Sequence, residues 1–201
     1  DSGTTADITG GFSNVGSFDG GTGDDSFVIS TGSLSGSIDG QAGNDTLENT
    51  QGANTFDLTG ANSGEMTDLA DGFSNVENLQ GGDDEDTFNI ASGASLSGSI
   101  DGGELINTIN QDDDGNTFTV TGTDAGSTDG ITGGFTNVGN LNGGDGNELF
   151  DFDGGDVTGS IDGEGGINTL QLDDVQNTVE ITGDDSGTAM PAIAGTFDDI
   201  N

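Results

Sequence analysis

The sequence Leu-Ser-Gly-Ser-Ile-Asp-Gly at residues 34–40 returns at residues 96–102, and a third version, Val-Thr-Gly-Ser-Ile-Asp-Gly, fills residues 157–163. Each copy ends on a large apolar residue, a variable residue and a glycine, and this triplet recurs at a nearly constant spacing of about 20 residues. The triplets end at Gly20, Gly40, Gly60, Gly81, Gly102, Gly122, Gly143, Gly163 and Gly183. Such a constant period is typical of a solenoid, in which each repeat is one coil stacked on the last.

A longer repeat of about 61 residues contains three of these coils. Gly-Phe-Ser-Asn-Val at residues 11–15 returns at residues 72–76, and then as Gly-Phe-Thr-Asn-Val at residues 134–138. We therefore expect residues 1–201 to form one continuous solenoid segment, with three-coil repeats over about residues 11–71, 72–133 and 134–195.

The segments between the glycines predict strands. They are short and rich in Phe, Val, Ile and Thr, as in Ser-Phe-Val-Ile at residues 26–29, and Gly, Asn and Asp turns separate them. No window carries the apolar stripe of a helix. The expected fold is all-β, a parallel β-solenoid of the β-helix or β-roll kind with about 20 residues per coil. We expect it to be right-handed, because this coil length exceeds the roughly 18 residues of three hexapeptides.

Phenylalanine supplies every aromatic side chain, with 11 residues in all. The equivalent positions Phe12, Phe73, Phe135 and Phe197, and likewise Phe27, Phe88 and Phe150, predict stacked core ladders between coils. The recurring Asn14, Asn75 and Asn137 fit either turn asparagines or a buried amide ladder, with the turn favoured.

The charge is extreme: 38 acidic residues and no Lys, Arg or His give a net charge of −38. With 28% apolar residues this composition would normally indicate disorder, but the long register of the repeat favours an ordered solenoid. The absence of basic residues makes nucleic acid and anionic lipid poor partners. No stretch is apolar enough to insert into a membrane. The carboxylates need cations from solution, bound divalent metal or wide spacing.

Several turns after the glycine triplets match the nonapeptide Gly-Gly-x-Gly-x-Asp-x-U-x, where U is a large apolar residue. Residues 20–28 fit it fully, and residues 40–48 and 81–89 each lack a glycine. This resembles the calcium-binding haemolysin-type (RTX) repeats of secreted bacterial proteins. The resemblance implies Ca²⁺ bound by turn carbonyls and by the sixth-position aspartate. The implied ligand positions are Asp25, Asp45, Asp86, Gly21, Gly23 and Gly43.

The remaining turns depart from that pattern. They place Asn107, Glu148 and Asn168 at the sixth position, and the nonapeptides are not in tandem. In these turns Asp and Asn equally fit turn residues that bond their own backbone.

Nearly the whole chain resembles the repeat arrays of giant secreted bacterial surface proteins and adhesins. That resemblance implies an extracellular or cell-surface location and a structural or adhesive rod or filament, as in a biofilm matrix, with Ca²⁺ as a stabilising ion. The alternative is an RTX-type, calcium-dependent segment of a type I-secreted toxin or enzyme.

An enzyme is not expected. There is no His, Cys or basic residue for acid–base or nucleophilic catalysis, and the carboxylates repeat with the coils instead of clustering once. An ice-binding face would need regular Thr-x-Thr rows, which occur only locally, as at residues 117–119.

The two ends have nearly the same phase: residues 1–4 match residues 185–188, and Phe12 matches Phe197. Neither end reads as a polar capping coil, so we expect open strand edges. The expected partners are a continuation of a longer chain, or further copies stacked end to end, together with divalent cations.

Overall fold

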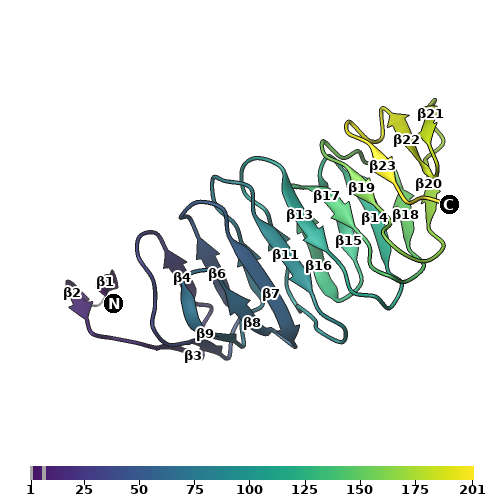
Figure 1. The fold of residues 1–201 in the computed structure, drawn as a ribbon. Helices are drawn as coiled ribbons and strands as arrows, with labels where there is room; N and C mark the ends of the chain where they lie inside the picture. The colour runs from purple at the N-terminus through teal and green to yellow at the C-terminus, as the bar shows by residue number, and fades with distance from the viewer. Residues whose placement is uncertain (1, 6–7) are drawn as a thin grey trace.

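The computed structural model describes residues 2–5 and 8–201, and in it the chain is all-β, with two mostly parallel sheets of nine and twelve strands. Figure 1 shows an elongated body in which the strands lie side by side along one axis, with the two termini at opposite ends. No helix in the described part of the chain is long and apolar enough to cross a membrane. The match at Asp1 and the side chain of Phe12 lie outside what the structure describes.

Single strands alternate between the two sheets as the chain advances. Those of the nine-stranded sheet are β4 (Ser26–Ile29), β6 (Thr46–Asn49), β10 (Asn78–Gln80), β12 (Ile100–Asp101), β18 (Leu149–Phe152) and β20 (Thr169–Gln171). Those of the twelve-stranded sheet are β3 (Phe18–Gly21), β5 (Ile38–Gln41), β11 (Thr87–Ile90), β13 (Asn107–Asn110), β17 (Val138–Asn142) and β19 (Ile161–Asp162). Within each sheet these strands pair in parallel.

Each long repeat also contains an antiparallel three-stranded meander. The first is β7 (Thr55–Gly60), β8 (Ser63–Met66) and β9 (Leu69–Ser74). The second is β14 (Thr117–Gly122), β15 (Ala125–Thr128) and β16 (Ile131–Thr136), and the third is β21 (Thr178–Gly183), β22 (Ser186–Met190) and β23 (Phe197–Asp198). The expected parallel β-solenoid did not include these antiparallel segments, so the two large sheets are mostly rather than wholly parallel.

Successive meanders lie in opposite sheets. The first and third belong to the twelve-stranded sheet, and the second belongs to the nine-stranded sheet. The reason is that four single strands separate one meander from the next, so the chain makes an odd number of sheet crossings between them. Equivalent residues one long repeat apart consequently face the core from opposite sides. β1 (Ser2–Thr5) and β2 (Ile8–Ser13) form a separate two-stranded sheet.

The core is a set of inward-facing ladders that run along the strand stack. In the twelve-stranded sheet the register joins Phe56 to Phe88, Ile109, Leu141 and Ile161, and all of these side chains are at most 1% exposed. The Phe56 and Phe88 rings stack with their centroids 4.9 Å apart. Phe118 of the second repeat stacks on Phe150 of the third, with their centroids 5.2 Å apart. Aromatic burial and stacking thus bind the first and second meanders to the strand that follows each in its sheet.

The predicted ladders of equivalent phenylalanines do not form. Phe73, Phe135 and Phe197 are buried, but they pair with Ile38, Ile100 and Ile161 respectively. Phe135 lies in the opposite sheet from the other two, and several strands separate Phe73 from Phe197 within the twelve-stranded sheet. The asparagine prediction is confirmed in its turn form: Asn14, Asn75 and Asn137 all have φ between 51° and 58°. Asn75 and Asn137 each donate a side-chain hydrogen bond, to Asp39 and Asp101 respectively.

Candidate functional site

The three aspartates predicted to bind metal lie at equivalent corners of the body. Asp25 immediately precedes β4, Asp45 precedes β6 and Asp86 precedes β11. At such a corner the chain turns from one sheet into the other, and backbone N–H groups there have no strand partner. These groups need acceptors, because an unpaired buried N–H is costly.

Side-chain oxygens of the neighbouring coil provide those acceptors. The Asp25 N–H donates to Oδ1 of Asp45 at 2.7 Å, and the Asp45 N–H donates to Oε2 of Glu77 at 2.8 Å. Asp45 is 0% exposed, and its second oxygen, Oδ2, has no hydrogen-bond partner in the described structure. The carboxylates here act first as acceptors for the turn of the preceding coil.

Asp86 is more fully bonded. Its Oδ1 accepts the backbone N–H of Asn54 at 2.7 Å and the Asn54 side-chain amide at 2.9 Å. Its Oδ2 accepts the N–H of Gly82 at 2.8 Å, and its own N–H donates to Oδ1 of Asn107 at 2.7 Å. This carboxylate is surrounded by hydrogen-bond donors, an environment that compensates its charge without a cation.

The same contact recurs near the C-terminal end, where the Glu148 N–H donates to Oδ1 of Asn168 and the Asn168 N–H donates to Oδ1 of Asn201. We call the whole set the corner ladder. It comprises three runs, which are Asp25, Asp45 and Glu77; Asn54, Asp86 and Asn107; and Glu148, Asn168 and Asn201.

The corner ladder accounts for the presence of both Asp and Asn at the sixth motif position. Each has a side-chain oxygen that accepts a hydrogen bond, and the oxygens of Asp45, Asp86, Asn107 and Asn168 accept one from a backbone N–H. A backbone N–H donates to a carboxylate oxygen and to an amide oxygen alike. Glu148, at the same motif position, joins the ladder only through its own backbone N–H.

Glu148 is the corner-ladder residue whose side-chain hydrogen-bonding capacity is least satisfied. Both of its carboxylate oxygens are buried without a hydrogen bond. Burial raises the pKa of this carboxyl, and the nearby Glu164 carboxylate raises it further, while the facing backbone amides of Asn116, Glu148 and Gly144 partly offset the rise. None of these amides is placed well enough to count as a hydrogen bond. Burial likewise raises the pKa of Glu48, with contributions from Asp101 and Asp83.

The three predicted glycines have different local roles. Gly21 has φ of 128°, which an L side chain rarely adopts. Gly43 has φ of 154°, and a Cβ built on it would overlap the carbonyl oxygen of Gly23. Gly23 has an unstrained φ, and open space surrounds its Cβ position. Close coil-to-coil contact therefore requires glycine at residue 43 but not at residue 23.

The structure brings Asp25 and Asp45 into contact but places Asp86 in a different run of the corner ladder. Within the described residues there is no group of three or more acidic side chains arranged to hold a metal ion. Calcium ligation by Asp25, Asp45 and Asp86, with Gly21, Gly23 and Gly43, stays a prediction.

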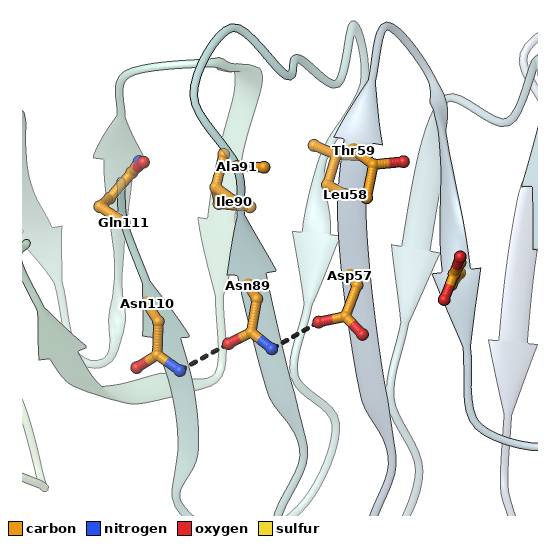
Figure 2. Close-up of a pocket in the computed structure, with 9 residues that line it drawn as sticks. Asp57, Leu58, Thr59, Asn89, Ile90, Ala91, Asn110 and Gln111 are labelled. Atoms are coloured by element: carbon orange, nitrogen blue, oxygen red, sulfur yellow. Dashed lines mark hydrogen bonds between the residues drawn. The ribbon is translucent and has the colours of Figure 1, made fainter. Parts of the chain in front are cut away.

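A second repeated feature lies on the outer face of the twelve-stranded sheet. Figure 2 shows Asp57, Asn89 and Asn110 in a row on adjacent strands, joined side chain to side chain. Asn89 donates to Asp57 and Asn110 donates to Asn89, each at 2.6 Å, and Asn142 extends the row by donating to Asn110 at 2.8 Å.

Asp57, Asn89 and Asn110 of this row line an open groove of about 480 Å³, which Thr59, Glu65 and Gln111 also border. Sequence reasoning missed the row, because the separations between its members along the chain are unequal and follow no single period. The side chains of the row use their hydrogen bonds on one another, so the row is a stabilising ladder of amides that begins at the Asp57 carboxylate.

Comparisons of the chain with protein-family models, with curated proteins and with solved structures find no match.

Proposed function

We propose that this chain is a segment of an extracellular structural or adhesive rod, a right-handed β-solenoid with about 20 residues per coil, within a large secreted surface protein. The observation that carries the proposal is the continuity of the core. Inward-facing ladders run from the phenylalanines of the first meander to Phe197, without an interruption for a single reaction centre among the described coils. The same repetition supports a non-catalytic role.

The net charge supports the proposal of a rod that is exposed to an extracellular medium containing salt. The 38 acidic groups belong to a body without a basic side chain, so neighbouring rods repel each other until salt or divalent cations screen them. Such a surface suits a filament or matrix component that must remain separate from anionic membranes and nucleic acid.

Gold-labelled antibodies against the chain test this proposal on the cells that produce it. We expect label on the surface of intact cells, lying along thin fibres. Label that appears only after permeabilisation, in the cell interior, would contradict the proposal. Labelling of an abundant cytosolic protein controls for leakage through damaged envelopes.

A second candidate is a calcium-dependent segment of the RTX type, from a type I-secreted toxin or enzyme. The buried Oδ2 of Asp45, which lacks a hydrogen-bond donor, favours it, because a hard cation prefers such an oxygen ligand. The Gly21 and Gly23 carbonyls belong to the turn of the preceding coil and carry the same kind of oxygen.

Thermal unfolding in Ca²⁺, in Mg²⁺ and in chelator separates the two candidates. Calcium binding predicts a higher Tm in Ca²⁺ only, with the gain lost in Asp45→Asn and kept in Asp71→Asn, which removes one charge from an exposed site. Identical melting in Ca²⁺ and chelator would remove the calcium candidate and leave coil stacking as the source of stability.

A further inference from the structure

The outer face of the twelve-stranded sheet carries two facing carboxylates in the middle of the chain. Asp57 of β7 and Glu65 of β8 are directly paired in the antiparallel register, so their side chains lie on the same face. Both residues line the groove beside the amide ladder. Like charges opposite each other destabilise a strand pair, and the chain has no Lys, Arg or His to compensate them. A cation from outside the chain would therefore stabilise this pair.

Both carboxylates retain free hydrogen-bonding capacity. Within the described part of the chain, Asp57 accepts one side-chain hydrogen bond, from Asn89 at 2.6 Å, and the exposed Glu65 carboxylate accepts none. An ionised carboxylate has about four lone-pair sites. The two groups thus offer several oxygen acceptors to a donor in the groove.

The amide ladder extends this row of acceptors along the strand stack. Asn89 lies opposite Asp57, and Asn110 lies opposite Asn89, on successive parallel strands. Figure 2 shows these three side chains in one line. The amide oxygens of Asn89 and Asn110 each accept one hydrogen bond from the next residue of the row and keep a second lone pair. Acceptor oxygens therefore recur at the strand spacing of about 4.8 Å.

The carboxylate pair breaks the symmetry of the repeat. At the corresponding positions the second meander pairs Thr119 with Ser127, and the third pairs Glu180 with Thr188. Among the three meanders that the structure describes, the first alone places two carboxylates there. A feature that served coil stacking would recur with the coils, whereas a ligand site need occur only once.

The rest of the lining suits an aliphatic chain. Leu58, Ile90 and Ala91 line the groove beside the polar row. The groove volume of about 480 Å³ is in the range of small-molecule sites. The groove thus combines a line of carboxylate and amide oxygens with apolar side chains next to it.

We propose that this groove binds a linear aliphatic polyamine whose nitrogens are three carbons apart. Such amines are protonated at pH 7 and carry hydrogen-bond donors without an acceptor, which complements the line of oxygens. With bonds of about 1.5 Å, successive nitrogens lie about 5 Å apart, close to the strand spacing of about 4.8 Å. The first ammonium group lies between Glu65 and Asp57, and the two that follow lie between successive members of the row as far as Asn110. The methylene groups contact the apolar lining.

Isothermal titration calorimetry of the 201-residue chain with bis(3-aminopropyl)amine tests the proposal. At pH 7 in 0.15 M NaCl, where the screening length is about 8 Å, salt suppresses general binding to the acidic surface. We expect one site per chain. Asp57→Asn and Glu65→Gln should each weaken binding about tenfold, because each removes a charge-assisted hydrogen bond. Asp57→Asn keeps the ladder, since an amide oxygen still accepts the bond from Asn89.

Asp151→Asn is the matched control. Asp151 is also a strand carboxylate that accepts one side-chain amide, from Gln171 at 2.7 Å. Its strand partners are Thr119 and Gln171, so no second carboxylate lies opposite it. This variant loses the same charge and should bind the triamine with the affinity of the natural sequence.

The spacing is tested with a triamine of equal charge whose nitrogens are five carbons apart, or about 7.5 Å. Its ammonium groups fall out of register with the row, so it should bind about tenfold more weakly. Several weak sites that Asp57→Asn leaves unchanged, equal weakening by Asp151→Asn, or equal affinity for the two triamines would each overturn the proposal. These outcomes do not depend on cell-surface labelling, so this proposal and the rod proposal can fail separately.

Discussion

At the scale of the residue, a small set of buried polar side chains supplies hydrogen-bond acceptors to backbone N–H groups at the turns, where no paired strand supplies them. Asp45, Asp86, Asn107 and Asn168 are at most 1% exposed, and each accepts a backbone N–H from a turn. Their positions could be predicted from the nonapeptide spacing, but their role could not. A side-chain oxygen in a turn can bind a metal ion or accept a hydrogen bond from a backbone N–H. The sequence does not distinguish these roles, because it does not show which groups of the neighbouring coil lie beside the oxygen.

Asn107→Ala should lower the free energy of unfolding by about 1–3 kcal/mol, because it leaves the buried Asp86 N–H without an acceptor. Urea unfolding measures the change. Asn44→Ala is the matched control, since Asn44 accepts an exposed side-chain bond from Asn78, and its removal should cost less than about 0.5 kcal/mol. Equal costs for the two variants would contradict the ladder.

Glu148 gives a prediction in pH. Burial raises the pKa of this carboxyl above 4.5, so the folded chain holds the proton more tightly than the unfolded chain does. The stabilisation is present at pH values below 4.5 and is lost as the pH rises through the folded pKa. Glu148→Gln, which stays neutral, should therefore have a higher Tm than the natural chain at pH 7, and the difference should vanish near pH 4.

Calorimetry across this pH range checks the expectation. The control is Glu85→Gln, which removes a carboxylate from an exposed position. A Glu148→Gln variant that gains no more stability at neutral pH than this control would show that the buried carboxylate carries no special cost.

At the scale of the element, the strands could be predicted from alternation and glycine spacing, but the meanders could not. The third triplet of each long repeat, ending at Gly60, Gly122 or Gly183, looks like the other triplets in sequence and lies in an antiparallel strand. A signal was present: Asn62, Asp68 and Asp124 occupy tight turns with φ between 49° and 66°. Such residues favour the left-handed turns of hairpins, but a solenoid corner uses them too.

Consecutive coils offer a matched pair of substitutions. Gly43→Ala should destabilise the chain on the order of 1–3 kcal/mol, because the new Cβ would overlap the Gly23 carbonyl oxygen. Gly23→Ala meets open space and should be neutral or slightly stabilising. Thermal or urea unfolding of both variants measures the difference. A Gly23→Ala variant as unstable as Gly43→Ala would mean that the coils are not in this register.

At the scale of the whole molecule, an odd number of sheet crossings per long repeat turns each repeat by half relative to the last. The half turn places Phe135 in the opposite sheet from Phe73 and Phe197, and intervening strands separate those two, so each of the three pairs with an isoleucine. The chain tolerates a content of only 28% apolar residues, because inward side chains are covered by the coils on either side. The composition alone would have favoured disorder, and only the register of the repeat opposed it.

Residue-resolved amide hydrogen exchange tests the central claim, that a continuous ladder of buried contacts orders the whole stack. The backbone amides of Asp45, Asn54, Asp86, Glu148 and Asn168 precede their strands and donate to corner-ladder oxygens. The account predicts that these amides exchange as slowly as those inside the parallel strands, at corners from one end of the molecule to the other. Exchange of these corner amides at the rates of an unfolded chain, with protection confined to the strands or absent altogether, would contradict it.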